Sequence, residues 1–279
     1  MKLRVGCEIT VRTPAPCPIV AMLRPRSGLA QWLSSETYIF DPWMPTTEHV
    51  DGFGNLCQRM VVPAGDTRIR VEAVVETEGV LATAPQAPWA PVETLPDDVL
   101  HYLLPSRYCP SDTLEAKAWE IVGQAAPGYA QAEAIRAWVQ ANTEYRYGAS
   151  DASTDAADTI AAGSGVCRDF AHVGIALVRA LQIPARMVVG YLHGLEPMDL
   201  HAWFEAWVGG RWYAFDGTQA EPRGGRVVLA YGRDAADVAF ISNYGALQTV
   251  AMTVWADEAP APELPPPTPL PTPQAEPPG

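Results

Sequence analysis

The segment TAPQAPWAPVETLP, residues 83–96, divides the sequence into two parts whose patterns differ. Its prolines at positions 85, 88, 91 and 96 exclude an α-helix, because proline lacks an amide hydrogen and its ring clashes with the preceding turn. We therefore expect an extended linker here, with separately built structure before and after it.

The residues before the linker carry the pattern of β-strands. The stretches KLRVGCEITVR (2–12), QRMVVP (58–63) and TRIRVEAVVETEG (67–79) alternate apolar and polar residues or are rich in β-branched ones. Clusters of proline and glycine, such as RTPAPCP and DGFGN, separate them. Residues 1–95 are predicted to comprise an all-β domain of sandwich-like or barrel-like form, together with the linker.

The residues after the linker change from helical to strand patterns. Apolar residues recur with helical spacing in 111–126 and 129–147, and the segment 167–183 is apolar around most of its circumference, which is typical of a central helix. Five strand-like stretches follow, at 185–192, 201–208, 211–217, 226–232 and 247–256. Helices followed by an antiparallel sheet predict an α+β domain over residues 96–256.

The chain ends in a proline-rich segment, residues 257–279. Such a composition is typical of a disordered or polyproline II tail. A docking partner for this tail is a second reading, and the sequence leaves it open.

Net charge and cysteine content limit the kinds of partner and the cellular compartment that we expect for this protein. A net charge of −13 argues against nucleic acid or an anionic membrane surface, because both need clustered Lys and Arg. Five scattered cysteines without CxxC spacing suggest neither a disulfide framework nor a zinc site, and no apolar run has the length of a membrane span. Since the N-terminus also lacks a signal-peptide pattern, we expect a cytoplasmic protein with reduced thiols. The oligomeric state is left open.

The stretch GSGVCRDFAH, residues 163–172, places Cys167 between a glycine-containing turn and the predicted central helix. Taken alone, a free cysteine is more often a small buried apolar residue than a nucleophile. At the start of a helix, however, the dipole favours a thiolate, and the free backbone N–H groups suit an oxyanion. Cys167 is therefore a candidate nucleophile that needs a histidine partner.

The candidate partners lie on a predicted hairpin. Gly209 and Gly210 form a two-residue turn signal, which sets a register in which paired positions sum to 419. Trp203 then lies opposite Asp216, and His201 is a diagonal neighbour of Asp216 on the same face. A slip of one residue would separate them. Helix 167–183 is expected to cover one face of this hairpin and to bring Cys167 to His201.

A Cys167–His201–Asp216 set has a clear chemical logic. The histidine shares the thiol proton, and the aspartate orients the imidazole and stabilises its charged form. The thiolate attacks a carbonyl to form a thioester, with the Cys167 backbone N–H stabilising the oxyanion. His172, five residues after Cys167 on the same helix, is assigned a structural role.

The sequence GVCRDFAHVGIALVRALQIPARMVVGYL … DLHAWFEAWVGGRWYAFDGT resembles the bacterial transglutaminase-like superfamily. Cys167, His201 and Asp216 match its cysteine, histidine and aspartate, and DGFGN (51–55) and GRDAADV (232–238) resemble features of the branch with an N-terminal β-domain. The resemblance implies a papain-like core, with the cysteine helix against an antiparallel sheet and the all-β domain in front. Gly217 departs from the proline that often follows the aspartate.

What the resemblance implies for function is a thiol enzyme acting on amide bonds. Our leading hypothesis is a cysteine protease or amidase that hydrolyses a peptide or protein substrate through a thioester acyl-enzyme. Transfer of the acyl group to an amine, and a non-catalytic binding module of the same fold, are the alternatives. No metal and no cofactor are expected. Tyr145 and Tyr147 are candidates for completing the oxyanion hole, although a core or groove-lining role is favoured for both.

Overall fold

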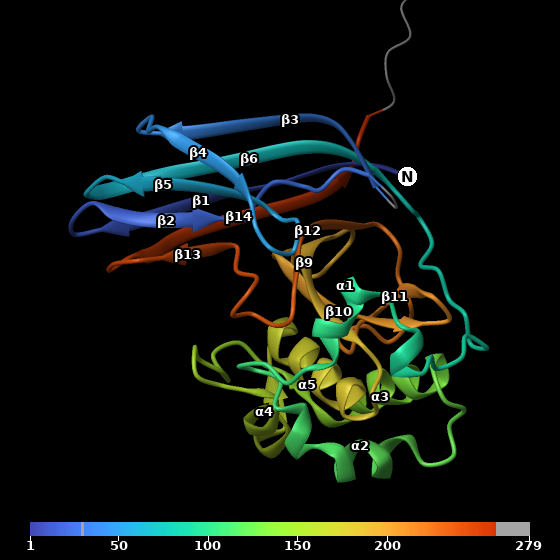
Figure 1. The fold of residues 1–279 in the computed structure, drawn as a ribbon. Coiled ribbons are helices and arrows are strands. Elements are labelled where there is room, and N and C mark those ends of the chain that lie inside the picture. The colour runs from blue at the N-terminus through green and yellow to red at the C-terminus, as the bar shows by residue number, and fades with distance from the viewer. Residues whose placement is uncertain (29–30, 261–279) are drawn as a thin grey trace, which may run out of the picture.

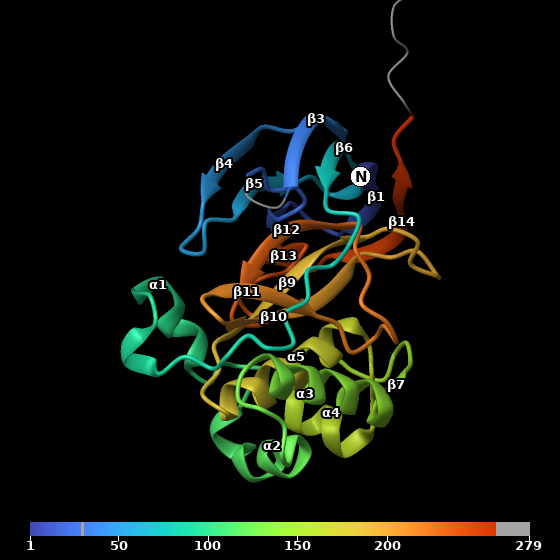
Figure 2. The same ribbon diagram turned by 90° about the vertical axis from the view of Figure 1, so that its right-hand side faces the viewer.

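The computed structural model describes residues 1–28 and 31–260, arranged as a two-sheet sandwich, a third sheet and a layer of helices (Figures 1 and 2). The sandwich sheets have the strand orders β14-β1-β6-β3 and β13-β2-β5-β4. The third sheet, here called the core sheet, has the order β11-β10-β9-β12, and all its pairings are antiparallel. The predicted α+β class is confirmed.

The sandwich is built from strands at both ends of the chain. Buried and exposed residues alternate along its central strands, and the buried side chains fill the space between its two sheets. Its strands are β1 (Lys2–Thr13), β2 (Cys17–Ala21), β3 (Gln31–Asp41), β4 (Thr46–Val50), β5 (Leu56–Val62), β6 (Gly65–Thr77), β13 (Ile241–Asn243) and β14 (Gln248–Glu258).

The last two strands correct one boundary of the predicted domains. β14 pairs along its length with β1, and β13 pairs with β2, so these residues complete the sandwich and do not belong to the unit predicted at 96–256. The strand pattern of β14 was recognised in the sequence, but an alternating pattern does not identify the sheet that a strand joins. Asp257 and Glu258, assigned to the tail, end β14, and residues 261–279 of that predicted tail lie outside the described residues.

The core unit follows the linker and carries most of the helices. Its strands are β7 (Glu144–Tyr145), β8 (Ser164–Gly165), β9 (Ala185–Leu192), β10 (His201–Val208), β11 (Arg211–Phe215) and β12 (Arg226–Gly232). Its helices are α1 (Asp97–Leu100), α2 (Glu115–Val122), α3 (Tyr129–Asn142), α4 (Ala156–Ala162) and α5 (Cys167–Ala180), with 3-10 turns at Val92–Thr94, His101–Leu103 and Ser111–Thr113. Among the described helices, none is long and apolar enough to cross a membrane.

Helix α5 packs against one face of the core sheet, as predicted. Eleven of its fourteen residues are buried, and α2, α3 and α4 pack against it away from the sheet (Figure 2). At Gly174 a Cβ atom would lie 2.3 Å from Cε1 of Phe204 in β10, so the helix approaches the strand more closely than any side chain would allow. This contact fixes the position of α5 relative to the hairpin.

The sandwich covers the edge strand β12 of the core sheet through two side-chain amides. Gln31 donates to the Val228 carbonyl (2.9 Å) and accepts from the Val228 N–H (2.7 Å). Asn55, from the DGFGN turn, donates to the Tyr231 carbonyl (2.7 Å) and accepts from the Tyr231 N–H (2.8 Å). Each amide thus bonds to the edge as a neighbouring strand would, and the N–H and carbonyl groups of Val228 and Tyr231 are satisfied.

Candidate active site

Cys167 is the first residue of α5, and two glycines shape the backbone before it. Gly163 ends α4 with a φ of +63°, a conformation that L-residues rarely adopt. At Gly165 a Cβ atom would lie 2.7 Å from the Cβ of Asp169, so a side chain there would collide with the helix. The backbone therefore turns closely into α5 and places the sulfur at its N-terminus, where the helix dipole favours negative charge.

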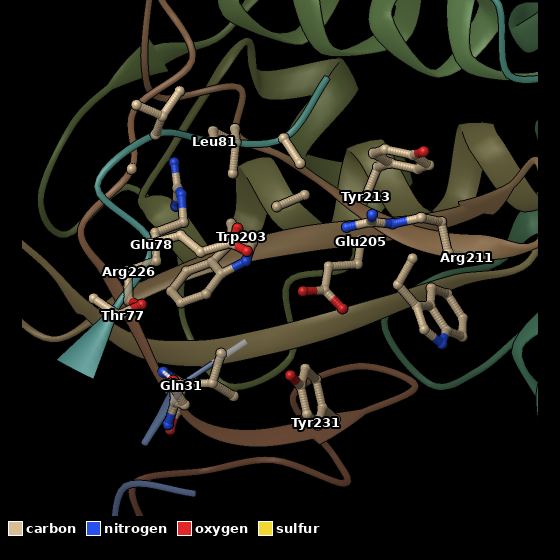
Figure 3. Close-up of a pocket in the computed structure, with 16 residues that line it drawn as sticks. Gln31, Thr77, Glu78, Leu81, Trp203, Glu205, Arg211, Tyr213, Arg226 and Tyr231 are labelled. Carbon is tan, nitrogen blue, oxygen red and sulfur yellow. Dashed lines mark hydrogen bonds between the residues drawn. The ribbon is translucent and has the colours of Figure 1, made fainter. Parts of the chain in front are cut away.

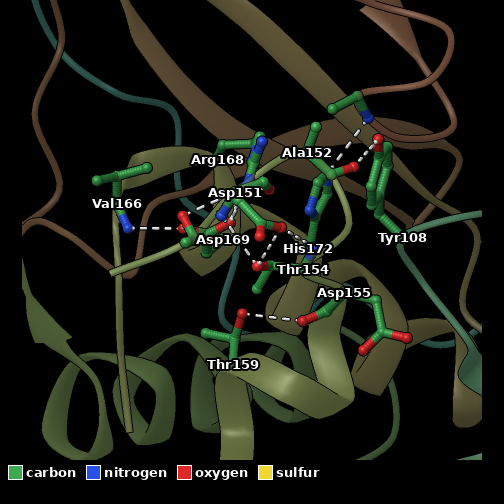
Figure 4. Close-up of polar contacts among 12 residues, drawn as sticks. Tyr108, Asp151, Ala152, Thr154, Asp155, Thr159, Val166, Arg168, Asp169 and His172 are labelled. Atoms are coloured by element: carbon green, nitrogen blue, oxygen red, sulfur yellow. Dashed lines mark hydrogen bonds and ion pairs between the residues drawn. The ribbon is translucent and has the colours of Figure 1, made fainter. Parts of the chain in front are cut away.

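Asp169, two residues after Cys167, caps the N-terminus of α5 (Figure 4). Its buried carboxylate accepts hydrogen bonds from the Val166 N–H (2.8 Å) and from the Ser150 hydroxyl, and it pairs with the Arg168 guanidinium (2.9 Å). Arg168 also donates to the Asp151 carbonyl (2.8 Å). The sequence interpretation gave Asp169 no role, although an acid three residues after the N-cap is a recognisable capping signal.

The hairpin β10–β11 has the predicted register. Val208 pairs with Arg211 across the turn formed by Gly209 and Gly210, whose φ angles are +58° and +83°. These positive angles are the ones that a two-residue hairpin turn requires. The prediction that paired positions sum to 419 is confirmed.

This register brings His201 and Asp216 together. His201 Nε2 lies 2.8 Å from Asp216 Oδ2, and both side chains are almost fully buried. Cys167 lies close enough to the His201 ring to act on its charge. His201 is the first residue of β10, so its imidazole lies at the end of this hairpin strand. The three residues singled out in the sequence therefore meet.

The electrostatics of this group favour a charged imidazole. Burial disfavours the imidazolium, but the Asp216 carboxylate and the Cys167 sulfur outweigh it and raise the pKa of His201 to about 9. Burial would likewise raise the pKa of Asp216, yet His201, Arg226 and Thr218 together lower it well below its ordinary value. Asp216 is thus held as a carboxylate, and His201 as its cationic partner, at neutral pH.

Asp216 has a second cationic partner that the sequence interpretation missed. Arg226, only 7% exposed, donates from Nη2 to Asp216 Oδ2 at 2.9 Å and from Nε to the Arg223 carbonyl at 3.1 Å. Its guanidinium lies 4.8 Å from the centre of the Trp203 ring. Thr218 satisfies the other carboxylate oxygen through its N–H (3.0 Å) and hydroxyl (2.7 Å). The only signal for Arg226 was a charged residue opening an otherwise apolar strand.

Arg226 and Trp203 also border a cavity of about 120 Å³ between the core sheet and the sandwich (Figure 3). The Arg226 Nη1 and the Trp203 Nε1 are buried and have no hydrogen-bond partner among the described residues. This cavity lies at the sandwich side of the hairpin and does not include Cys167.

Tyr145 lies beside the nucleophile candidate. Burial, followed by the nearby charges of Cys167 and Tyr147, raises the pKa of Tyr145. Its ring contacts Tyr147 and Phe170 at centre-to-centre distances of 5.5 and 5.8 Å. The Tyr145 phenol therefore lies close to Cys167.

His172 is structural, as predicted. It is fully buried, stacks on Tyr108 at 5.0 Å, and accepts a hydrogen bond from the Ala235 N–H at 3.1 Å through Nε2 (Figure 4). Burial lowers the pKa of His172 to about 3, so its ring is neutral. Ala235 belongs to the GRDAADV segment, which the structure places against α5.

Two cavities meet at the Cys167–His201 pair. The larger, of about 690 Å³, is lined by Cys167 and by mostly apolar side chains of the core unit and the sandwich. The smaller, of about 260 Å³, is lined by His201 together with Tyr145 and Tyr147. Asp199, two residues before His201, borders both.

Comparison with known proteins agrees with this geometry. The family model of the transglutaminase-like superfamily matches residues 115–217, which include all three residues of the group. A solved structure of a candidate cysteine protease from Cytophaga hutchinsonii is 35% identical, superimposes with a TM-score of 0.88, and covers 95% of this chain and 93% of that one. The chain belongs to the transglutaminase-like superfamily.

Curated relatives of this transglutaminase-like protein occur in mycobacteria. An uncharacterised protein of Mycobacterium leprae is 29% identical over 233 residues, covering 78% of this chain and 83% of the relative. An uncharacterised protein of Mycobacterium tuberculosis is 36% identical over 109 residues, about a third of either chain. The first of these matches extends beyond the family model.

Proposed function

We propose that this protein is a cysteine-dependent amide hydrolase, a peptidase or amidase, with Cys167 as nucleophile, His201 as acid and base, and Asp216 as the group that orients the imidazole. The observation that carries the proposal is the position of Cys167 at the N-terminus of α5, close to a histidine whose Nε2 lies 2.8 Å from a buried carboxylate. This is the arrangement that activates a thiol toward carbonyl carbon.

The reaction follows from the positions of the groups. The Cys167 thiolate attacks the amide carbon, and the carbonyl oxygen takes up negative charge beside the Cys167 N–H and the Tyr145 hydroxyl. His201 then gives its proton to the leaving nitrogen, and a thioester forms. Water, deprotonated by His201, attacks the thioester carbon, and the free acid and the thiol are released.

Mass spectrometry of a glutamine-containing peptide incubated with a primary amine tests the reaction. Hydrolysis predicts a shortened peptide or a gain of one dalton, and both products are absent with Cys167→Ala. An amine adduct would instead show acyl transfer to an amine, which is the alternative reaction that membership of the superfamily suggests. Cys167→Ala is expected to unfold at the same urea concentration as the wild type or a higher one, because active-site groups are not optimised for stability.

The rate of thiol alkylation separates an enzyme from a binding module of the same fold. A sulfur paired with His201 is expected to react with iodoacetamide well below pH 8 and faster than Cys109 and Cys57, which are buried and have a raised pKa. Equal labelling of the three cysteines would contradict the activated nucleophile and favour the binding module.

We also propose a cytoplasmic location and a peptide or protein substrate, with no nucleic acid or membrane partner. All five cysteines are free, and a reducing compartment keeps the Cys167 thiol available. Cell fractionation with an antibody against the protein tests the location, and recovery outside the cytoplasm would contradict it.

A further inference from the structure

We propose that the cleft selects amides whose acyl half carries a bulky apolar side chain and whose amine half carries a positive charge. This inference rests on the proposed function, because the direction of proton transfer assigns the two halves of the substrate to the two cavities.

Proton transfer sets the orientation. The acyl carbon becomes bonded to Cys167, whereas the leaving nitrogen must lie within reach of His201 to receive its proton. The larger cavity includes Cys167 and not His201, and the smaller includes His201 and not Cys167. The larger cavity is therefore the acyl subsite and the smaller one the amine subsite.

The acyl subsite is wide and mostly apolar, although Arg168 and Asp199 also line it. Leu200, Val238 and Phe240 line it, and so do Ile9 and Met252, which form a wall contributed by the sandwich. A volume of about 690 Å³ is ample for a leucine or phenylalanine side chain, whose burial supplies about 1.5–3 kcal/mol. The sandwich thus takes part in substrate selection, and its first and last strands meet at this wall.

The amine subsite has the opposite character. Glu196 and Asp199 contribute two carboxylates, and Tyr145 and Tyr147 contribute aromatic rings. The cation in this part of the described chain is the His201 imidazolium, and no Lys or Arg lines it. Arg223, which contacts the neighbouring Gln219, is held by the carbonyls of His193 and Gly194. Carboxylates and aromatic faces both attract an ammonium or guanidinium group.

Asp199 is the residue that most needs such a partner. It is half-buried, and it makes no ion pair among the described residues. Its Oδ1 accepts a hydrogen bond from the Leu200 N–H at 2.7 Å, and burial raises the pKa of Asp199. The His201 charge acts on Asp199, but it is already paired with Asp216, so a ligand that brings a second cation would stabilise this partly desolvated carboxylate further.

Binding to full-length Cys167→Ala protein tests both subsites without turnover. Four acetylated tetrapeptide amides carry phenylalanine or serine on the acyl side of the central bond, and lysine or norleucine on its amine side. Norleucine matches the lysine side chain without its charge. We expect calorimetry to give the tightest dissociation constant for the phenylalanine–lysine peptide, and a weakening of about tenfold for each replacement, equivalent to about 1.4 kcal/mol.

Second substitutions in the Cys167→Ala protein assign the preferences to residues. Asp199→Asn is expected to remove the preference for lysine and keep that for phenylalanine, and Phe240→Ala is expected to do the reverse. Glu221→Gln, an exposed acid outside both cavities, is the control and should keep both preferences. Equal or absent binding of the lysine and norleucine peptides, or a lysine preference that survives Asp199→Asn, overturns the inference.

Turnover by the wild-type protein is a separate measurement on the same peptides. Selective binding to Cys167→Ala, together with no product from the wild type, would refute the proposed hydrolase while leaving the two subsites in place. Unselective binding together with cleavage of all four peptides would refute the subsites and leave the hydrolase.

Discussion

Asp216 Oδ2 accepts hydrogen bonds from two buried cations, the His201 imidazole at 2.8 Å and the Arg226 guanidinium at 2.9 Å. The guanidinium offsets part of the carboxylate charge, so Asp216 stabilises the His201 imidazolium less than it would without Arg226. Arg226 is a positioning residue in this arrangement: it touches neither substrate nor sulfur, but it holds and screens the group that orients His201.

Arg226→Gln is expected to move the upper limb of the pH profile of Cys167 alkylation to higher pH. Without the guanidinium, Asp216 stabilises the imidazolium more strongly, so the proton on His201 is lost later. Loss of a charge-assisted hydrogen bond should also lower the free energy of unfolding by about 2 kcal/mol. Arg226→Lys keeps the charge and serves as the control. An unchanged limb in Arg226→Gln would contradict the sharing of Asp216.

The raised pKa of His201 also predicts how stability depends on pH. A folded-state pKa of about 9 lies above the value of about 6.5 expected in the unfolded chain. The stabilising contribution is thus complete below pH 6.5 and is lost as the pH rises through 9. Urea unfolding should show the wild type losing stability over this interval and His201→Gln losing less. Parallel curves for the two proteins would contradict the shift.

At the scale of single elements, Gly174 allows α5 to pack closely against β10. Gly174→Ala would put a methyl group 2.3 Å from a ring carbon of the buried Phe204, and we expect a loss of about 1–3 kcal/mol of unfolding free energy. Phe204→Leu in the same chain should restore part of it. Gly52→Ala, where nothing lies within 4 Å of the added atom, is the control, with an expected change below about 0.5 kcal/mol. Similar values for both alanine variants would disprove the close contact.

The hairpin was predictable because its information is local. Gly209 and Gly210 set the turn, the turn sets the register, and the register places His201 beside Asp216 within sixteen residues of sequence. Several other elements were not predicted, among them β3 and α4. Strand β3 is polar and mostly exposed, so its alternation is weak, and helix α4 has only seven residues.

At the scale of the whole molecule, the contacts that join the sandwich to the core sheet were beyond sequence patterns. The Gln31 amide meets Val228, 197 residues away, and the Asn55 amide meets Tyr231, 176 residues away. An amphipathic pattern indicates which residues are buried, but it does not identify the distant residues that they contact. For the same reason β14 was recognised as a strand and assigned to the wrong unit.

Asn55→Ala is expected to weaken this junction. Asn55 is fully buried, and its loss leaves the N–H and carbonyl of Tyr231 without their side-chain partners, which should cost about 2 kcal/mol of unfolding free energy. Urea unfolding followed by tryptophan fluorescence measures the loss. Asn142→Ala, an exposed amide at the end of α3, is the control and should change stability by less than about 0.5 kcal/mol. Equal effects would mean that the amide bridge contributes nothing specific.

The pairing of β1 with β14 has a mechanical consequence. Leu3 lies opposite Glu258, so the outer ends of the first and last strands are side by side, and the core unit is a loop of chain that leaves the sandwich after β6 and returns at β13 (Figure 1). A tension applied between Lys2 and Glu258 would open the β1–β14 ladder one rung at a time, starting at that end. The two cavities beside Cys167 and His201 would experience no tension until the ladder had opened.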